Sequence, residues 1–402
     1  MAQPSILISM LFIVSSLFVT SVLSRSIPNQ TIKLDKLSRI RAQLEKINKP
    51  AVKTINSPDG DIIDCVLFHD QPAFDLPELK DQKTTLKLPE WPVGYNSSKD
   101  TSTGDENIQL WSASSEECPG GTVPILRTTE QDLLRVSNII RFGKKDKVKK
   151  RHEYAVAYAS GDQYYGAKTN INIWAPKTNQ FEFSLAQVWL LSGTRQNNDL
   201  NSIEAGWQVQ PELYWDTNPR LFGYWTRDTY QSTGCYNTLC PGFVQTNKRI
   251  TLGAAIKPIS SYNGKQFDMN FKIWKDPKSG NWWLSIGSRI LIGYWPSSLF
   301  TGLKSHAERI EFGGEIVNSA VNGHTTTQMG SGHFPEKGLF KKSAYFRNLY
   351  FVNSKNQYVS FPVSNLRTHV EDPNCYDIKL LSGKVFGTHF YYGGPGKNPK
   401  CP

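Results

Sequence analysis

The chain has 402 residues, of which 39% are hydrophobic and 12% aromatic, and its formal net charge is +11. The length predicts two or three domains, and the many aromatic residues favour β-structure, because rings pack well on a pleated, half-buried surface. The basic charge is compatible with an anionic partner such as a cell-wall polymer. No nucleic-acid-binding motif accompanies it, so nucleic acid is excluded as an expected partner.

The N-terminal segment has the pattern of an export signal. The stretch Ile6 to Leu23 is apolar apart from small polar residues, and Val22-Leu23-Ser24 offers small groups for cleavage. We predict a signal peptide over residues 1–24, although no Lys or Arg precedes the apolar stretch. A membrane anchor is the alternative, since roughly 18 apolar residues can span a bilayer. We expect cleavage, export to the apoplast or the vacuole, and no membrane contact afterwards.

The segment after the signal predicts a small α+β domain over residues 25–143. Apolar residues recur every three or four positions from Ile32 to Lys49, which predicts a helix ended by Pro50. A Pro58-Asp59-Gly60 turn then separates two strand-like runs within Val52–Leu67. Asn29 and Asn96 head N-x-S/T sequons and are predicted glycosylation sites in an exported chain.

A basic run follows, Lys144 to Arg151, in which only Asp146 and Val148 are not basic. Such a run is more typical of a solvated, protease-sensitive linker than of a binding patch. We therefore predict a linker or cleavage region over residues 144–151. A folded segment ahead of a cleavable joint is the layout of a zymogen, and an ordinary two-domain protein is the alternative.

From residue 152 to 402 the chain alternates short apolar and polar runs between Gly, Pro, Asn and Asp residues. The predicted strands are Tyr154–Ala159, Asn170–Trp174, Phe181–Leu191, Ser202–Val209, Leu221–Thr226, Arg249–Ile256, Asp268–Trp274, Trp282–Ile286, Arg309–Val317 and Tyr350–Val352. Asp276 to Gly280 predicts a hairpin connection. Many short strands indicate an all-β domain, and we predict an antiparallel β-sandwich.

The six cysteines lack C-x-x-C and Cys/His spacings, so disulfides are favoured over a metal site, although spacing does not fix the pairing. No metal or other cofactor is expected. The chain also lacks a G-x-S-x-G elbow, an H-E-x-x-H pair and a Gly-rich phosphate loop. Carboxylates within predicted strands remain as the candidates for chemistry, because acidic residues are uncommon in strands.

Two predicted strands carry such carboxylates. In one, Ile203, Ala205 and other apolar residues share one face, while Glu204, Gly206 and Gln208 share the other. Gly206 leaves space beside Glu204 where a substrate backbone can approach. In the second strand, Glu311, Gly313 and Glu315 share a face, and alternation treats its two glutamates alike.

If two such acids lie close together, their pKa values differ, so that one is charged while the other holds a proton. The charged acid can activate water, the protonated one can assist the leaving group, and Gln208 can orient the water or stabilise the oxyanion. The same pair can hydrolyse a glycosidic bond. The alternative is that these glutamates are solvent-facing charges on a sandwich surface.

Over nearly its whole length after the signal, the sequence resembles the neprosin family of plant proteins. The resemblance is carried by the motifs Asp64–Val66, Gln71–Asp75, Ser202–Val209, Tyr224–Thr226, Gln231–Tyr236, Cys240–Thr246, Gly280–Trp283, Gly293–Pro296, Glu311–Glu315, Thr325–Phe334 and Tyr391–Gly396. It implies a secreted zymogen of a glutamic endopeptidase that cleaves proline-containing peptides, after proline and in acid. It also implies an activation domain ahead of a β-sandwich with a groove across one sheet.

The resemblance assigns the catalytic pair to Glu204 and Glu315, the second glutamate of the E-x-G-G-E run. It implies the disulfides Cys65–Cys118, Cys235–Cys240 and Cys375–Cys401. Phe312 stands where the founding member of the family has Trp. Aromatic side chains are candidates for a groove wall against which a rigid proline ring can lie, namely Tyr224, Trp225, Trp282, Trp295 and Phe312. The rival interpretation is a non-catalytic cell-wall or carbohydrate-binding β-sandwich protein.

Overall fold

The computed structural model describes residues 35–82, 87–94, 108–113, 116–136, 138–145, 151–335 and 340–402. The predicted signal peptide, the two sequons at Asn29 and Asn96, and residues 146–150 of the basic run lie outside this part of the chain. Contacts divide the chain into two compact units. One comprises Met1–Ile47 with Thr128–Ile140, and the other comprises Asn48–Arg127 with Arg141–Pro402.

The first unit is helical. Its longest described helix covers residues 35–47 and ends before Pro50, within the range predicted from the sequence. Ile40 and Ile47 are buried on one face of this helix. A short helix, α3 (Glu130–Arg135), begins with a capping box between Thr129 and Asp132. None of the helices in the described part of the chain has both the length and the apolar character needed to cross a bilayer.

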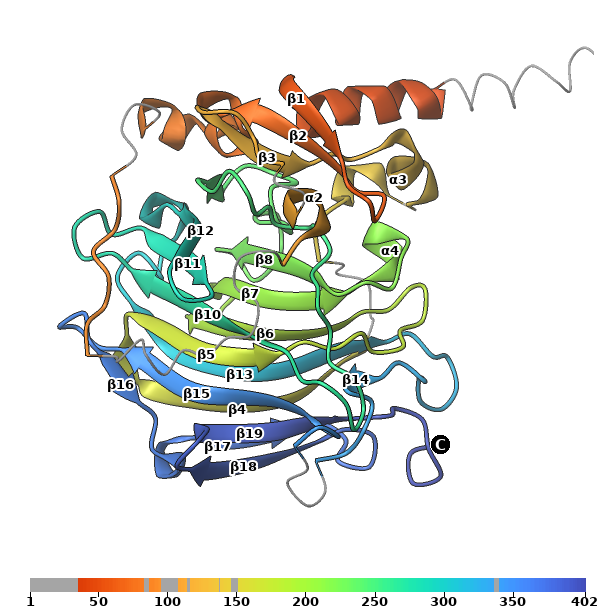
Figure 1. The fold of residues 1–402 in the computed structure, drawn as a ribbon, viewed down its shortest axis with the longest axis vertical. Coiled ribbons are helices and arrows are strands. Elements are labelled where there is room, and N and C mark those ends of the chain that lie inside the picture. The colour runs from red at the N-terminus through yellow and green to blue at the C-terminus, as the bar shows by residue number, and fades with distance from the viewer. Residues whose placement is uncertain are drawn as a thin grey trace, which may run out of the picture. The chain divides into compact units, whose positions relative to one another are not determined.

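The second unit is built from antiparallel strands (Figure 1). Its strands are β1 (Ala51–Asn56), β2 (Ile62–Leu67), β3 (Thr122–Leu126), β4 (Arg151–Tyr164), β5 (Gly166–Asn172), β6 (Ser184–Ser192), β7 (Asn201–Val209), β8 (Arg220–Thr226), β9 (Val244–Gln245), β10 (Asp268–Lys275), β11 (Trp282–Ile286), β12 (Ile290–Trp295), β13 (Ala307–Asn318), β14 (Met329–Gly330), β15 (Ala344–Val352), β16 (Tyr358–Ser360), β17 (Arg367–Val370), β18 (Asp377–Gly383) and β19 (Gly387–Gly394). Its short helices include α2 (Leu110–Ala113) and α4 (Pro211–Tyr214).

The strands form three sheets. The small sheet has the order β1-β2-β3 and contains the predicted hairpin, with Gly60 at a positive φ in its turn. The largest sheet has the path β14-β19-β15-β5-β10-β11-β12-β9, and off this path β16 pairs with β15 and β18 pairs with β19. The third sheet has the order β17-β4-β13-β6-β7-β8. The fold is therefore the predicted all-β sandwich preceded by a small α+β segment.

The core lies between the two larger sheets. Ile203, Ala205 and Trp207 of β7 share one buried cluster with Phe271 of β10 and Leu284 of β11. Side chains alternate along each strand, so the opposite face of β7 is turned away from this core. The predicted strand at residues 249–256 is wrong, because this segment runs as irregular backbone with only one isolated bridge, between Arg220 and Ala255.

The segment that carries the small sheet is attached to the sandwich by buried polar contacts. The carboxylate of Asp61 accepts two hydrogen bonds from Arg220 of β8, at 2.9 and 3.0 Å. Gln71 accepts from the backbone nitrogen of Gln245 at 2.7 Å and donates back to its carbonyl oxygen at 3.1 Å. Because both pairs are buried, separating this segment from the sandwich requires these groups to be rehydrated.

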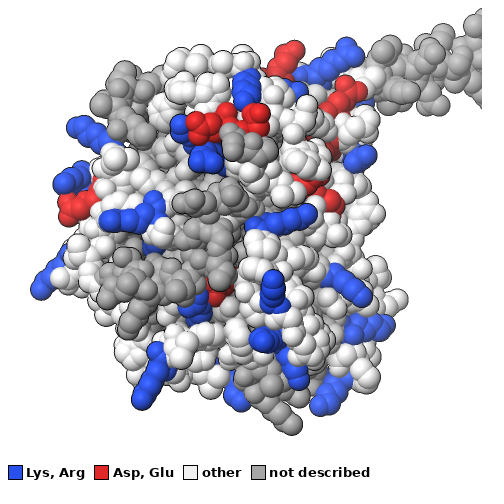
Figure 2. Space-filling model, viewed as in Figure 1, with Lys and Arg blue, Asp and Glu red and all other residues white. Residues whose placement is uncertain are grey.

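Lys and Arg side chains are spread over the face shown in Figure 2 and do not gather into one patch. The basic side chains on this face are thus dispersed, and a cell-wall polymer as a partner stays a prediction from the sequence.

Candidate active site

The outward face of the six-stranded sheet carries the two predicted catalytic glutamates. Strand register aligns Glu204 of β7 with Trp189 of β6, and Glu315 of β13 with Leu185 of β6. Residues directly opposite one another share a face, so both carboxylates project from the same side of the sheet. They lie diagonally across β6, two residue rows apart.

A single ammonium group joins the two carboxylates. The Nζ atom of Lys145 lies 2.6 Å from Oε2 of Glu204 and 3.8 Å from Oε2 of Glu315. The two oxygens are therefore no farther apart than these two distances together, a gap that one or two water molecules can bridge. The Lys145 side chain is only 8% exposed, and its nitrogen also lies 5.1 Å from the ring centres of Tyr224 and Tyr230.

The electrostatics of this group follow from its position. Burial favours the neutral form of Lys145, but the charges of Glu204 and Glu315 outweigh burial and hold the pKa well above its ordinary value. Burial likewise raises the pKa of Glu315, yet Lys145 and His152 together lower this pKa to about 2. In the state described, both Lys145 and Glu315 are charged.

The backbone before Lys145 is also fixed in the site. The carbonyl oxygen of Gly143 accepts a hydrogen bond from the backbone nitrogen of Tyr236 at 2.7 Å. The Tyr224 hydroxyl accepts from the backbone nitrogen of Lys145 at 3.3 Å. Gly143 has φ +78°, and a Cβ there would stand 2.8 Å from Cβ of Leu239. This approach requires glycine, so the segment fits its position closely.

Hydroxyl groups surround Glu204. Its Oε1 atom accepts from Ser202 at 2.6 Å and from the Tyr230 hydroxyl at 2.8 Å. Tyr230 and Thr229 both have φ near +60°, a conformation that costs of order 1–3 kcal/mol per non-glycine residue. The carboxylate of Asp228 holds this turn by accepting from backbone nitrogens at residues 231–233. The strained turn therefore serves to place the Tyr230 hydroxyl against Glu204.

The surroundings of Glu315 are different, because they include a second basic side chain besides Lys145. Its Oε1 atom lies 2.6 Å from Nδ1 of His152, the second residue of β4. Its Oε2 atom accepts from Nε2 of Gln187 at 3.3 Å. Once Lys145 is removed, Glu315 still faces an imidazole, whereas Glu204 faces neutral hydroxyls.

Glu311, the other glutamate of the E-x-G-G-E run, lies on the same face and pairs with Arg309 at 2.5 Å. Burial raises its pKa, and the charge of Arg309 opposes this shift. No contact joins Glu311 to Lys145 among the described residues. Glu315 thus contacts Lys145 whereas Glu311 pairs with Arg309, a difference that the alternation along the strand did not predict.

The predicted groove residues divide into two groups. Tyr224 stands in the row of Glu204 and contacts Lys145, and Gln208 shares this face but donates to Tyr214 at 3.2 Å, away from both carboxylates. Trp225, Trp282, Trp295 and Phe312 lie in the core between the sheets, so their prediction as groove residues is wrong. Alternation explains the correction, since Trp225 is aligned with Ile203 and Phe312 with Val188, both core residues.

Four residues of the site were not predicted from the sequence, namely Lys145, His152, Gln187 and Tyr230. The alternation of Phe181–Leu191 carried a signal for Gln187, which occupies an outward position in an otherwise apolar strand. Lys145 carried no such signal, because a basic run is ordinarily solvated. The three disulfides join Cys65–Cys118, Cys235–Cys240 and Cys375–Cys401, and the second closes the loop that presents Tyr236 to the site.

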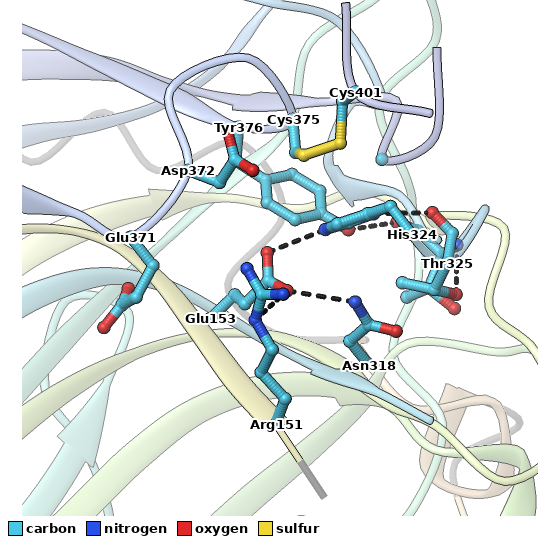
Figure 3. A network of polar contacts seen from close by, with 12 residues as sticks. Arg151, Glu153, Asn318, His324, Thr325, Glu371, Asp372, Cys375, Tyr376 and Cys401 are labelled. Atoms are coloured by element: carbon cyan, nitrogen blue, oxygen red, sulfur yellow. Dashed lines mark hydrogen bonds and ion pairs between the residues drawn. A yellow bond between two sulfur atoms is a disulfide. The ribbon is translucent and has the colours of Figure 1, made fainter. Parts of the chain in front are cut away.

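A separate buried polar network lies at the start of β4 (Figure 3). Glu153 accepts from Asn318 at 3.1 Å and lies 2.8 Å from Nε2 of His324 and 3.1 Å from Nε of Arg151. His324 also lies near the sulfurs of Cys375 and Cys401. Both sulfurs are consumed by the disulfide, so this cluster has a structural role and cannot ligate a metal through them.

The structure thus places two carboxylates on one face of a β-sandwich, both in contact with the ammonium group of Lys145. The chain belongs to the Neprosin family, whose profile matches residues 180–395, and the profile of the Neprosin activation peptide matches residues 54–168. The protein is thus a glutamic peptidase in its zymogen form, and peptides are its substrates.

Among solved structures, a scytalido-glutamic peptidase with a peptide-based transition state analogue is 10% identical over 61% of this chain and 100% of that chain, with a TM-score of 0.34. The peptidase SCP-B of the Eqolisin family, in complex with the tripeptide Ala-Ile-His, is 10% identical over 61% of this chain and 98% of that one, with a TM-score of 0.32. A beta-porphyranase from Bacteroides plebeius is 8% identical over 59% of this chain and 64% of that one, with a TM-score of 0.21. The assignment rests on the family match.

Proposed function

We propose that the chain is the precursor of an exported endopeptidase that cleaves after proline in acid, with Glu204 and Glu315 as its catalytic pair. The observation that carries the proposal is the bridging of both carboxylates by the one ammonium group of Lys145. Two carboxylates this close are suited to share one proton in acid, once the cation has left.

The surroundings of the two acids support a division of roles. His152 favours the charged form of Glu315, so we assign Glu315 as the base, which leaves Glu204 as the acid of the pair. Glu315 takes a proton from water as the water oxygen adds to the scissile carbonyl carbon, and Glu204 gives its proton to the carbonyl oxygen. Glu315 then protonates the leaving nitrogen as the carbon–nitrogen bond breaks. One hydroxyl of the intermediate returns a proton to Glu204, which restores both groups.

Latency follows from the same contacts. A bound ammonium group requires two charged carboxylates, whereas the reaction requires one of them to be protonated. Lys145 therefore both blocks the space above the pair and holds the pair in the wrong protonation state. Protonation of Glu315 in acid weakens this contact, which agrees with an enzyme that works at low pH.

A preference for proline is supported by the rings beside the pair. The rings of Tyr230 and Tyr236 both lie against Tyr224, with ring centres 5.8 and 4.8 Å from that of Tyr224. A rigid proline ring can stack on such a surface at little cost in conformational entropy. Export to the apoplast or vacuole is supported by three disulfides, which persist in oxidising compartments.

The test is cleavage of a peptide with one internal proline, and of the same peptide with alanine there, by the acid-treated full-length chain between pH 3 and pH 7. We expect cleavage after proline at low pH, and its loss by at least about 100-fold in Glu204→Gln and Glu315→Gln. Circular dichroism and thermal unfolding check that the variants fold. Full activity in either variant contradicts the assignment of the pair, and equal cleavage of the two peptides contradicts the preference for proline.

A further inference from the structure

A third polar side chain, Gln187 of β6, lies between the two carboxylates. Strand register aligns Gln187 with Gly206 of β7 and with Gly313 of β13. This row lies between the row of Glu204 and the row of Glu315, and β6 lies between the strands that carry them. Gln187 therefore occupies the middle of the diagonal that joins the two acids.

The row that contains Gln187 has no other side chain on these three strands. A Cβ at Gly206 would overlap the carbonyl oxygen of Ala186, and one at Gly313 would overlap that of Ala155. Both positions therefore require glycine, and the Gln187 amide stands alone on the floor between Glu204 and Glu315.

The hydrogen bonds of this amide are incomplete in a specific way. Its Nε2 donates to Oε2 of Glu315 at 3.3 Å, which fixes the orientation of the amide plane. Gln187 is 0% exposed, so its Oε1 is buried. This oxygen has no hydrogen-bond partner among the described residues. A buried acceptor without a donor costs of order 1–3 kcal/mol, so this oxygen is a place where a donor is missing.

We propose that Gln187 is a third catalytic residue, whose Oε1 atom accepts a hydrogen bond from the attacking water while Glu315 accepts the other. This inference rests on the proposed function of the pair. The Nε2–Glu315 hydrogen bond sets the two acceptors side by side, so a water molecule that donates to both has its lone pair turned towards the substrate. Glu315 takes the proton of its own hydrogen bond as the oxygen–carbon bond forms, and Gln187 keeps its two amide hydrogens throughout.

The experiment compares Gln187→Met and Gln187→Glu in the full-length chain, assayed after acid treatment on the proline peptide. Methionine keeps the size and removes both polar atoms, so we expect kcat to fall about 100-fold while KM stays within about twofold. Glutamic acid retains both functions only when protonated. Its activity relative to the unmodified chain should therefore rise as the pH falls, whereas that of Gln187→Met should stay low at every pH.

The matched control is Gln245→Met. Gln245 is also 0% exposed, and its Oε1 likewise has no hydrogen-bond partner in the described part of the chain, but it lies in β9 of the other sheet. We expect this variant to lose thermal stability and keep its kcat. Equal losses of kcat in Gln187→Met and Gln245→Met, in step with stability, would show a structural role and overturn the inference. Unchanged kcat in Gln187→Met overturns it as well. Failure of the unmodified chain to cleave any peptide contradicts the proposed function instead.

Discussion

The ammonium nitrogen of Lys145 and the Oε2 atom of Glu204 lie 2.6 Å apart, so a residue of the basic run contacts a carboxylate of the site. The ammonium group of Lys144, its neighbour, donates only to the backbone oxygen of Ser232 at the surface, among the contacts of the described residues. These adjacent lysines form a matched pair for testing latency, because both substitutions remove one charge from the same segment.

We expect full-length Lys145→Ala to cleave peptide at pH 5 about tenfold faster than the unmodified chain, since a charge-assisted contact of roughly 1.5–3 kcal/mol is lost. Lys144→Ala should stay latent. The measurement is the initial rate before any processing, with chain length checked by mass spectrometry. Equal rates for the two variants would contradict a specific role for Lys145.

Acid should release the segment that contains Gly143 and Lys145 from the two carboxylates within a defined pH range. The pKa of Glu315 falls from its ordinary 4.5 to about 2 because Lys145 and His152 outweigh burial. For an acid with a lowered pKa, the stabilisation is complete above pH 4.5 and is lost as the pH falls towards 2. We expect the full-length chain to stay latent above pH 4.5 and to gain activity between pH 4.5 and 2, measured after stepwise acidification. Equal activation at pH 6 and pH 3 would rule out this mechanism.

The tight contact of Gly143 with Leu239 allows a second substitution that should weaken the binding of the segment that carries Lys145. Alanine at 143 places a Cβ 2.8 Å from Leu239 and must also adopt φ +78°. We expect Gly143→Ala to be active at pH 5, as Lys145→Ala is. Leu239→Ala in the same chain makes room for the added methyl group and should restore part of the latency. If the double variant is as active as Gly143→Ala, strain at φ and not the contact explains the effect.

The network around Glu153 should make stability depend on pH. Burial raises the pKa of Glu153, but hydrogen bonds with His324 and Asn318 outweigh it and lower the pKa. Burial lowers the pKa of His324, and its contact with Glu153 outweighs this and raises the pKa. The contribution of Glu153 is lost as the pH falls through its lowered pKa, and that of His324 is lost as the pH rises through its raised pKa. The pair is therefore most stabilising between pH 4.5 and 6.5.

We expect His324→Gln to lower the free energy of unfolding by roughly 2 kcal/mol at pH 5.5, and by less at pH 9. Denaturant titration at both pH values measures this difference. His69→Gln is the control, because its imidazole is half-exposed and lies near Asp70 at 3.8 Å only. The same loss for His324→Gln at both pH values would show that charge on the imidazole does not contribute.

A substitution of Phe312 tests whether this ring belongs to the hydrophobic core or contacts the substrate. It is 0% exposed and packs at a ring-centre distance of 6.0 Å from Phe361. Phe312→Ala should lower the free energy of unfolding by roughly 3–5 kcal/mol, as for other buried rings, and leave the preference for proline over alanine unchanged. Tyr224→Phe, on the site face, should instead change peptide cleavage with little loss of stability. A changed preference for proline over alanine in Phe312→Ala would contradict the assignment of this ring to the core alone.

Much of the fold could be predicted from local patterns. The helix before Pro50, the Pro58–Gly60 hairpin and the alternating strands follow from backbone restrictions and side-chain periodicity, which act over a few residues. Alternation also placed Glu204 and Glu315 on the outward faces of their strands. It failed at residues 249–256, where apolar side chains are buried by an irregular loop and not by a ladder.

The sequence alone determined on which face of its strand each side chain lies. Its motifs also determined the resemblance to a peptidase family. Only the tertiary structure decided which faces meet. The distance between Glu204 and Glu315, the central place of Gln187 and the entry of Lys145 between the acids depend on strand order and register. Those are set by the packing of segments far apart along the chain, so no local pattern contains them.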